Sequence, residues 1–448
     1  MLGGGLDLFG WTQVPPGWQF DLLGNRCTIR RGSSPRPAGD PRYFGGGTIP
    51  WIKIGDATKN AGRYIESTEE FVNQEGAKHS VRIPAGSLII ANSGVSLGFA
   101  AITKLEGCIH DGWLLPTELR ELDRDYLYYC INLVTHRIRT FADGTTQPNL
   151  NTDIARRLML PMPPLPEQRA IAHILGTLDD KIELNRGMNE TLEATARAIF
   201  KSWFVDFDPV RAKRAGAARR APTPPDIADL FPDRFEDSEL GEIPKGWRIA
   251  ALPDLIDVNP TRALRKGEIA PYLDMANMPT RGHSPDEVIE RLFGSGMRFV
   301  NGDTLVARIT PCLENGKTAY VDFLKDGQVG WGSTEYIVLR PKPSLPTEFA
   351  YCLARSEVFR DFAIQSMTGS SGRQRVPVDS LQHFGMVSPS DKVADMFGKL
   401  VRPLFARSRA ATDESNTLAA IRGALLPKLI SGELRVKDAE RFLKARGL

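Results

Sequence analysis

The sequence predicts an α+β protein in which two mixed α/β units are separated by two long helices that pack as an antiparallel coiled coil. A long stretch after Pro166 has no Pro and only two Gly, in a chain that contains 41 Gly and 32 Pro. Apolar residues in this stretch repeat every 3.5 positions, and a similar pattern returns near the end of the chain. These observations indicate an internal repeat with approximate two-fold symmetry.

The first unit is expected to span residues 1–162. Short apolar or β-branched runs, such as Ser87–Ala91, are separated by Gly, Pro, Asn and Asp. This pattern predicts a unit with many short strands and loops. One amphipathic helix is expected near Asp125–Phe141.

The first long helix is expected within residues 163–208. Pro166 suits the first helical position, and Pro209 stops the run. At 1.5 Å per residue such a helix is roughly 55–60 Å long. Steps of four and three residues from Ile171 trace a heptad seam that is apolar at both ends and Asn in the middle: Leu175, Leu178, Ile182, Asn185, Asn189, Leu192, Ala196, Ile199 and Trp203.

The two Asn residues of the seam predict its register. We expect Asn185 and Asn189 to face Ala411 and Ser415 or their neighbours in the second long helix. A buried Asn lowers the stability of a coiled coil but specifies its alignment. Replacement of both Asn residues by Leu is therefore expected to raise the melting temperature and loosen the register.

The residues 209–239 are expected to form a linker. The stretch Arg211–Pro225 is rich in Ala, Pro and basic residues, which is typical of a mobile, solvent-exposed segment. Contact of its basic side chains with DNA phosphates is the alternative interpretation.

The second half of the chain repeats the first. Val14–Trp18 recurs as Ile243–Trp247, and Pro163 matches Pro389, 226 positions later. A second unit is therefore expected at 240–387, with strands in Thr304–Ile309 and Tyr336–Leu339 and a helix near Thr347–Gln365. A second long helix is expected at 388–432, followed by a C-terminal tail at 433–448. The seam also recurs, with Arg422 as its one misfit: Phe397, Val401, Leu404, Ser408, Ala411, Ser415, Leu418, Arg422, Leu425 and Leu429.

Composition excludes several classes of protein. A net charge of +3 does not by itself indicate a nucleic-acid binder, so any basic surface must be local. The five Cys are scattered, which favours free thiols in a reducing cytoplasm over disulfides or a zinc site. The N-terminus does not resemble a signal peptide, and no apolar run approaches the ~20 residues that cross a bilayer. We therefore expect a cytoplasmic protein without a membrane partner.

The sequence contains no convincing catalytic motif. Gly316-Lys317-Thr318 resembles the end of a phosphate-binding loop, but Pro311 occupies the position of its first Gly. Asn259-Pro260-Thr261 lacks the second Pro and the aromatic residue of an amino-methyltransferase tetrad. We therefore expect neither a catalytic residue nor a metal ligand.

The loops carry side chains that suit nucleic acid. Arg, Gln, Asn, Ser and Thr read base edges or hold phosphates, although turn formation also explains such residues. The candidate DNA-binding residues are Arg30, Arg31, Ser33, Thr146, Gln147 and Asn149 in the first unit, and Arg308, Thr310, Ser370, Arg373, Gln374 and Arg375 in the second. Phe200, Trp203 and Phe204, near the end of the first long helix, are expected to offer apolar surface to partners.

Several segments resemble the specificity subunits of type I restriction–modification systems. Leu165–Arg169, Leu178–Asn185 and Phe200–Phe207 are similar to the central region of that family. Asn301–Leu305, Arg308–Cys312 and Trp331–Glu335 resemble segments of its target-recognition domains, and Lys428–Leu434 resembles the end of its distal helix.

The resemblance implies a non-catalytic DNA-recognition subunit of a prokaryotic defence system. Each target-recognition domain would read one half of a bipartite, asymmetric double-stranded DNA site, and the coiled coil would set the spacer. Two methyltransferase subunits and the restriction–translocase subunits would be its partners. S-adenosylmethionine, ATP and Mg²⁺ would belong to those partners, and this chain would hold no cofactor. A stand-alone DNA-modifying enzyme and a coiled-coil adaptor that binds only proteins are the alternatives.

Overall fold

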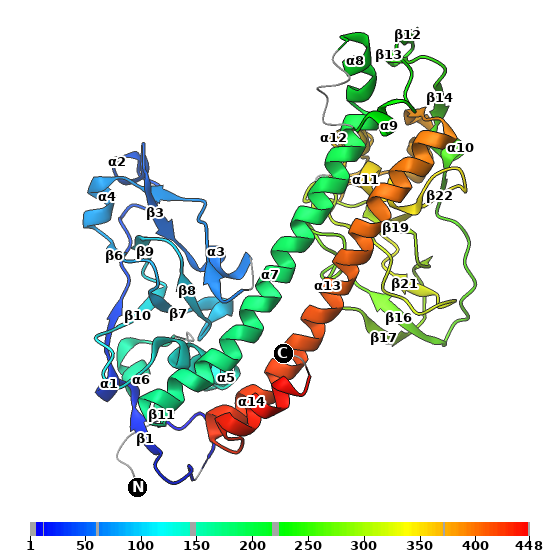
Figure 1. Ribbon diagram of the computed structural model, residues 1–448. Coiled ribbons are helices and arrows are strands. Elements are labelled where there is room, and N and C mark those ends of the chain that lie inside the picture. The colour runs from blue at the N-terminus through cyan, green and yellow to red at the C-terminus, as the bar shows by residue number, and fades with distance from the viewer. Residues whose placement is uncertain are drawn as a thin grey trace. The chain divides into compact units, whose positions relative to one another are not determined.

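The chain forms two compact units in the computed structural model, which describes residues 6–11, 13–59, 62–143, 149–216, 224–370 and 372–446. The first unit comprises Met1–Glu183 together with Asn416–Leu448, and the second comprises Leu184–Ser415. Each unit therefore contains part of both long helices, which are α7 (Leu165–Phe204) and α13 (Asp391–Ser431) in Figure 1.

The first unit contains two main sheets and a short strand pair. The pair is antiparallel and joins β1 (Gln19–Leu22) to β11 (Met159–Met162). One sheet has the order β2 (Thr28–Arg31), β10 (Trp113–Thr117), β7 (Leu88–Ala91), β8 (Ala100–Thr103), β4 (Tyr64–Ile65). The other has the order β5 (Phe71–Val72), β3 (Ile49–Ile52), β9 (Gly107–Ile109), β6 (Val81–Ile83). The helices before α7 are α1 (Leu23–Arg26), α2 (Pro41–Phe44), α3 (Ile54–Lys59), α4 (Gln74–Lys78), η1 (Gly94–Ser96), α5 (Arg124–Asp143) and α6 (Thr152–Arg156), and α14 (Val436–Lys444) follows α13.

The second unit repeats this arrangement, except that its first sheet has four strands instead of five. Its strand pair joins β14 (Arg248–Ala251) to β23 (Gly385–Ser388). Its two sheets have the orders β15 (Ile256–Val258), β22 (Tyr336–Pro341), β19 (Thr304–Ala307), β20 (Thr318–Tyr320), and β17 (Ile289–Leu292), β16 (Ile269–Leu273), β21 (Gly330–Gly332), β18 (Met297–Phe299). Its helices include α8 (Asp208–Arg214), α9 (Pro225–Ala228), α10 (Leu252–Leu255), α11 (Thr347–Ala354), α12 (Glu357–Gln365) and η2 (Val378–His383), and a hairpin joins β12 (Phe235–Ser238) to β13 (Gly241–Pro244).

The predicted internal repeat is confirmed at the level of topology. In both units the second sheet contains one parallel pair, β3 with β9 and β16 with β21, between antiparallel outer strands. The repeated Pro-x-Gly-Trp motif forms the same turn twice. Trp18 N donates to Pro15 O at 3.0 Å, and Trp247 N donates to Pro244 O at 3.0 Å. Gly17 and Gly246 have φ of +87° and +80°, a conformation that glycine adopts without steric cost.

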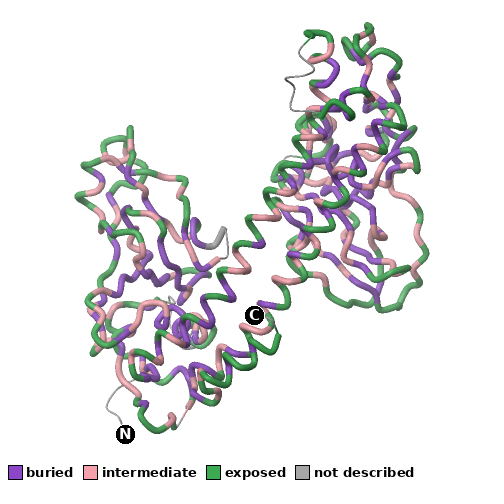
Figure 2. The backbone as a smooth tube through the Cα atoms, in the orientation of Figure 1, coloured by how far each residue is buried: buried purple, intermediate pink, exposed green. Residues whose placement is uncertain are grey.

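The central strands explain the short apolar runs of the sequence. All four residues of β7 and all four of β19 are buried. A strand that is covered on both faces reads as a continuous apolar run rather than an alternating one. Figure 2 shows the buried residues concentrated inside each unit.

The predicted antiparallel seam between α7 and α13 is confirmed within each unit. In the first unit Asp179 pairs with Arg422, whereas in the second Asn185 contacts Ala411 and Phe200 contacts Phe397. Partners in α13 thus move toward its N-terminus as the position in α7 increases. Every predicted seam residue of both helices is buried or half-buried.

Arg422 fits the seam because it has a charged partner. Its Nη1 donates to Asp179 Oδ1, and the Tyr129 hydroxyl donates to Asp179 Oδ2 at 2.6 Å. Burial lowers the pKa of Arg422, but the attraction of Asp179 outweighs it and raises the pKa above its ordinary value. The residue that interrupts the apolar pattern is therefore part of a polar network that includes α5.

Asn185 and Asn189 face the residues that the repeat predicts. Asn185 Nδ2 lies within hydrogen-bonding distance of Ala411 O (3.3 Å), Glu414 Oε2 (2.8 Å) and Ser415 Oγ (3.3 Å). Asn189 Nδ2 donates to Thr412 Oγ1 at 3.0 Å, but its buried Oδ1 has no hydrogen-bond partner among the described residues. The heptad pattern alone suggests that the two Asn residues are equivalent. Their hydrogen bonds show that they are not.

Two local expectations are wrong. The 209–239 segment is not simply an exposed linker, because α8 and α9 lie within it and Val210, Ile227 and Phe231 join the core of the second unit. Residues 217–223 lie outside the described part. The helix expected at Thr347–Gln365 is divided into α11 and α12.

The break between α11 and α12 has a clear physical cause. Ser356 Oγ accepts from Phe359 N at 3.3 Å and caps α12. The buried guanidinium of Arg355 donates to the carbonyls of Thr280, Gly282 and Gly316. The chain at Arg355 is therefore held by a neighbouring loop instead of continuing one helix.

The described part of the chain contains neither a membrane-spanning helix nor a metal-binding cluster. None of its helices has the length and apolar character needed to span a membrane. No cluster of three or more His, Cys, Asp or Glu side chains there could hold a metal ion. All five cysteines are free thiols.

The different environments of the two Asn residues give the first prediction, which replaces the expectation that Leu at both positions raises the melting temperature. Asn185→Leu should lower the free energy of unfolding by about 1–3 kcal/mol, because it removes the donor to Glu414 and buries an apolar group against polar ones. Asn189→Leu, the matched change one turn later, should be neutral or stabilising because it removes an unsatisfied oxygen. Calorimetric melting of the full chain measures both, and equal effects of the two changes would contradict the contrast.

The Asp179–Arg422 pair gives the second prediction. Arg422→Met should cost about 1–2 kcal/mol of stability, since it leaves a buried carboxylate without its cation while the exposed part of Arg422 moderates the loss. Asp179→Asn should cost less in the Arg422→Met background than in the wild type. A double-mutant cycle by calorimetry tests this coupling. Simple additivity of the two changes would show that the ion pair makes no net contribution.

Candidate nucleic-acid interface

A small network of backbone hydrogen bonds closes one end of the main sheet in the first unit. Beyond β7, Asn92 N donates to Gly112 O at 2.9 Å, across from the start of β10. Leu150 N donates to Asn92 O at 2.8 Å, and an isolated bridge joins Ser93 to Asn149. The loops after β7, before β10 and before α6 therefore meet at one place.

The second unit contains the same network. Arg308 N donates to Glu335 O at 3.0 Å, Val376 N donates to Arg308 O at 2.9 Å, and a bridge joins Ile309 to Arg375. By these bonds Asn92 corresponds to Arg308, Gly112 to Glu335, and Asn149 to Arg375. We call this shared set of bonds the backbone frame. It is the same in the two units although the side chains on it differ.

Glu335 connects two of the predicted basic residues on the frame. Its Oε1 accepts from Arg375 Nε at 2.8 Å and its Oε2 accepts from Arg308 Nε at 3.2 Å. Burial raises the pKa of Glu335, but the hydrogen bonds from Arg375 and Arg308 outweigh that effect and lower it below the ordinary value. The carboxylate is therefore ionised at neutral pH and holds the two guanidinium groups.

The other candidates of the second unit lie around this cluster. Thr310 N donates to Gln374 O at 3.0 Å, and Arg373 N donates to Ser370 O at 3.0 Å. Thr368 and Arg375 exchange two backbone hydrogen bonds of 2.9 Å, which close a tight loop. The structure thus brings together all six predicted residues of this unit, and the side chains of Ser370 and Arg373 are exposed.

Two candidates of the first unit lie at its frame. Asn149 is exposed and belongs to the frame itself. Arg31 Nε donates to Asp111 O at 2.8 Å, and the same carbonyl accepts from Asn92 Nδ2 at 2.9 Å. The Asp111 carboxylate in turn accepts from Ser34 Oγ at 2.6 Å and lies 3.0 Å from Arg36 Nη2. This site is polar but is built from different residue types.

The remaining candidates of the first unit do not join this cluster, or cannot be placed. Arg30 precedes Arg31 on β2, so the two side chains leave opposite faces of the strand. Ser33 Oγ donates to the carbonyl of His79, which follows α4. Thr146 and Gln147 lie outside the described residues.

Close packing near Arg31 depends on one glycine. Gly32 N donates to Trp113 O at 2.9 Å, and a Cβ at position 32 would lie 2.0 Å from His110 O. Any side chain would therefore push β2 away from the loop that carries Asp111.

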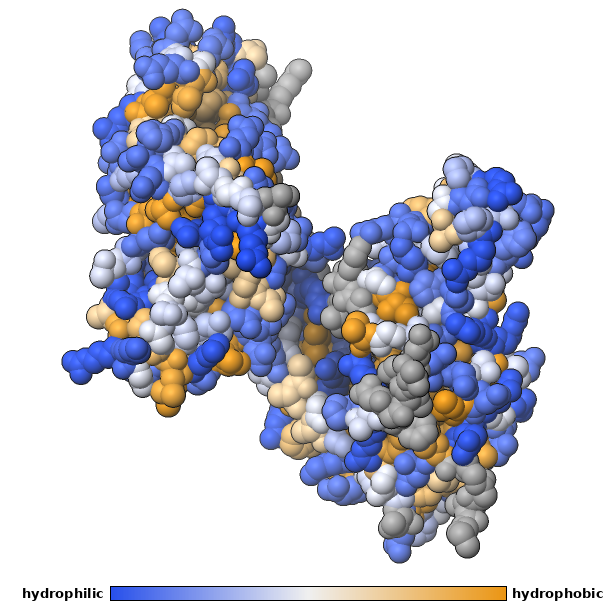
Figure 3. Space-filling model, turned by 180° about the vertical axis from the view of Figure 1, so that it is seen from behind, coloured by the Kyte–Doolittle hydropathy of each residue, from blue (hydrophilic) through white to orange (hydrophobic). Residues whose placement is uncertain are grey.

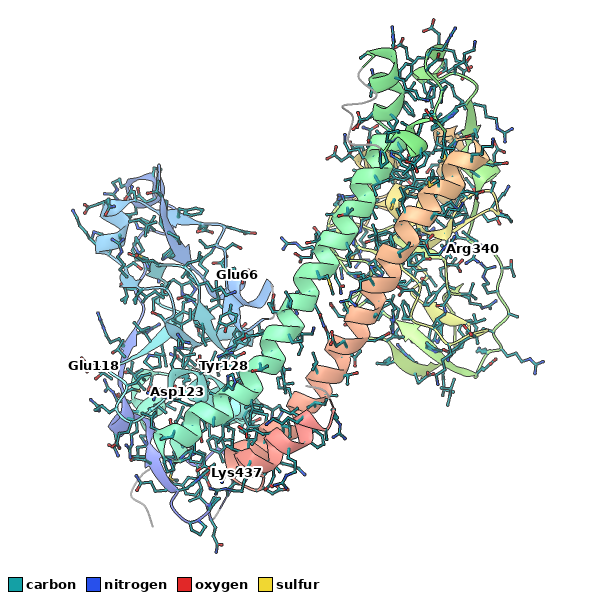
Figure 4. The ribbon with its side chains drawn as sticks, viewed as in Figure 1. Glu66, Glu118, Asp123, Tyr128, Arg340 and Lys437 are labelled. Atoms are coloured by element: carbon teal, nitrogen blue, oxygen red, sulfur yellow. The ribbon has the colours of Figure 1, made fainter. Side chains whose placement is uncertain are left out.

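Sequence inspection missed three residues of this interface, namely Asn92, Asp111 and Glu335. The sequence does contain a signal for the position of Asn92. Like Arg308, it directly follows a four-residue strand that is fully buried. Another charged cluster of the second unit is structural. Asp303, which is fully buried, pairs with Arg262 at 3.1 Å and with Arg340 at 3.2 Å (Arg340 is labelled in Figure 4).

Known proteins resemble this chain over nearly its whole length. Residues 15–194 match the family model described as the type I restriction modification DNA specificity domain. The specificity subunit of the MjaIX type I restriction enzyme from Methanocaldococcus jannaschii is 26% identical over 95% of both chains. The chain is therefore similar to the specificity subunits of type I restriction–modification systems over nearly its whole length.

Further relatives show the same similarity. The HindI specificity subunit of Haemophilus influenzae is 25% identical over 69% of this chain and 76% of its own. The crystal structure of a type I restriction–modification S subunit from M. genitalium covers 94% of this chain and 97% of its own, with a TM-score of 0.53 and 14% identity. That likeness supports the fold, with its mixed α/β units and paired long helices. Specificity subunits are the non-catalytic DNA-recognition components of such systems.

The aromatic residues near the end of α7 are not exposed, so the expectation of an apolar partner surface there is wrong. Phe200, Trp203 and Phe204 are 2%, 4% and 7% exposed. Their rings pack against Phe349, Phe397, Phe231 and Trp247 of the second unit. Hydrophobic residues on the face of the second unit seen in Figure 3 form small patches among hydrophilic ones.

The buried position of Phe200 gives the third prediction. Phe200→Ala should lower the stability of the second unit by about 3–5 kcal/mol, because it leaves a cavity between α7, α11 and α13. Leu184→Ala is the matched control on the same helix, since Leu184 is 66% exposed; its effect should stay within about 0.5 kcal/mol. Calorimetry combined with hydrogen exchange locates the loss. Unchanged stability of the Phe200 variant would contradict its place in the core.

Proposed function

We propose that this chain is a DNA specificity subunit that reads a bipartite, asymmetric DNA site, with one half-site read by each unit. The observation that carries this proposal is the backbone frame, which is the same in both units but carries Asn149 in one, and Arg308 and Arg375 in the other; Asn92, at the position of Arg308, is buried. Amide and guanidinium groups prefer different base edges. Two equivalent surfaces with unlike side chains should therefore select two unlike half-sequences.

The candidate residues divide into two groups in this proposal. The exposed basic residues Arg30 and Arg373 suit phosphate contacts, which give affinity without sequence preference. In the second unit the side chains of Arg308 and Arg375 suit base edges, because hydrogen bonds to Glu335 hold them in fixed positions. Thr310, Gln374 and Ser370 in the second unit and Ser33 in the first would complete the polar contacts around them.

We further propose that the α7–α13 pair fixes the length of the spacer between the half-sites. The two helices contain 40 and 41 residues, or roughly 60 Å at 1.5 Å per residue. One turn of B-DNA is about 34–36 Å long. A continuous helical pair of this length is long enough to separate two DNA-reading surfaces by about one turn. Its many seam contacts would keep that separation constant.

The proposed partners are double-stranded DNA, two methyltransferase subunits and the restriction–translocase subunits. The two-fold-like repeat supports two equivalent methyltransferase positions, one for each matching surface. S-adenosylmethionine, ATP and Mg²⁺ would be bound by those partners in the cytoplasm. The chain would contribute sequence choice and assembly to the complex.

Exchange of one unit gives the fourth prediction. Replacement of residues 244–387 by the matching segment of a relative should change one half of the methylated sequence and preserve the other half and the spacer. The reciprocal exchange of residues 10–162 should change only the opposite half. Genome-wide mapping of methylated bases in cells that express the complex provides the measurement.

Each result of these exchanges has a definite meaning. A change in both half-sites after one exchange would refute independent reading by the two units. A changed spacer length would refute the proposal that the α7–α13 pair fixes it. Methyl transfer by this chain alone, without a methyltransferase subunit, would support an enzyme instead.

A further inference from the structure

We infer that Arg375 reads a guanine in the half-site of the second unit and that Glu335 is the positioning residue that orients it. This inference rests on the proposed function and names the side chain that would determine one base of the site. It is drawn from the geometry of the Arg308–Glu335–Arg375 cluster.

The guanidinium of Arg375 is held at two points. Its Nε donates to Glu335 Oε1 at 2.8 Å, and its Nη1 donates to Arg373 O at 3.2 Å. These bonds occupy two of the five N–H donors that a guanidinium carries. The donors that remain suit the two acceptors of guanine in the major groove, O6 and N7, which arginine binds in a bidentate manner.

The three side chains of the cluster are exposed to different degrees, and Arg375 is the most exposed. The side chain of Glu335 is 21% exposed and that of Arg308 is 27% exposed, whereas that of Arg375 is 42% exposed. The carboxylate therefore lies deeper than the guanidinium of Arg375. With two cations around one anion, the cluster keeps a net positive charge and can approach DNA.

The backbone frame fixes the cluster to the sheet. Arg375 bridges to Ile309, and its N and O are both bonded to Thr368. Arg308 and Glu335 are bonded to each other through their backbones at the ends of β19 and β22. A side chain on this rigid support loses little further freedom when it binds a base, which favours sequence reading over a loose contact with phosphate.

The decisive experiment uses the full chain in complex with its methyltransferase subunits. Bound sequences are selected from a random duplex library, and affinity is measured as a function of salt. Arg375→Lys keeps the charge but loses the planar pair of donors. We expect the preference for guanine to fall roughly 5- to 150-fold at one position of one half-site. The salt dependence and all other positions should stay unchanged.

The outcomes separate this inference from the proposed function. A wild-type complex that selects no bipartite sequence would refute the proposed function itself. A normal bipartite selection that Arg375→Lys leaves unaltered would refute only the reading role of Arg375. For Arg375→Ala, equal weakening of all sequences together with a salt slope reduced by about one would assign Arg375 to a phosphate instead.

Glu335→Gln tests the positioning role. It replaces one of the two carboxylate oxygens by an NH2 donor and removes the negative charge that holds both arginines, so it should reduce the preference at the same single position. Tighter binding of every sequence with the base preference unchanged would mean that Glu335 only repels DNA, and would overturn the assignment. Glu290→Gln makes the same change of charge on β17, outside the frame, and should leave every preference unchanged. Thermal melting identifies any loss of folding, and in that case the Arg375→Lys result decides.

Discussion

The antiparallel contact between α7 and α13 is the constraint on which the rest of the structure depends. Ile171, Leu175 and Leu178 share the main core of the first unit with Leu418 and Leu425. Ala196 and Phe200 share the core of the second unit with Phe397 and Val401. Each unit therefore needs residues that are more than 200 positions apart to complete its core. The helices are structural parts of both units rather than a rod added to them.

The distribution of apolar and polar residues along the seam has a physical reason. Aromatic and aliphatic side chains lie where each helix packs against sheets and helices of its unit, so their burial stabilises the globular core as well as the helix pair. Asn185 is buried in the middle of the seam, where it contacts Glu414 and Ser415. There, directional hydrogen bonds fix the alignment of the helices.

Much of the fold could be predicted because long periodic patterns are local information. The heptads revealed both long helices, and the repeat revealed their antiparallel pairing. Interactions between distant segments left no such pattern. Arg422 looked like a misfit because its partners, Asp179 and Tyr129, lie on other helices. Phe200 looked available to partners because the rings that cover it, Phe349 and Phe397, lie on other helices and cannot be inferred from the sequence of α7.

The candidate site was predicted by residue type and only partly by place. Arg308 and Arg375 were named because guanidinium groups suit DNA, and they do lie together. Glu335 and Asn92 were missed because the bonds that place them are made by the backbone. Sequence inspection detects side-chain chemistry, but it does not detect which loops a hydrogen-bonded backbone joins.

The backbone frame has a consequence for how the protein can change over generations. Its bonds use only N–H and C=O groups, which every residue except proline provides in full. Side chains at positions 149, 308 and 375 can therefore be replaced without loss of the backbone bonds that hold the loops. Inherited variation at these positions is separated from variation in the core. On the proposed function, a lineage could acquire a new DNA target while the backbone frame stays the same.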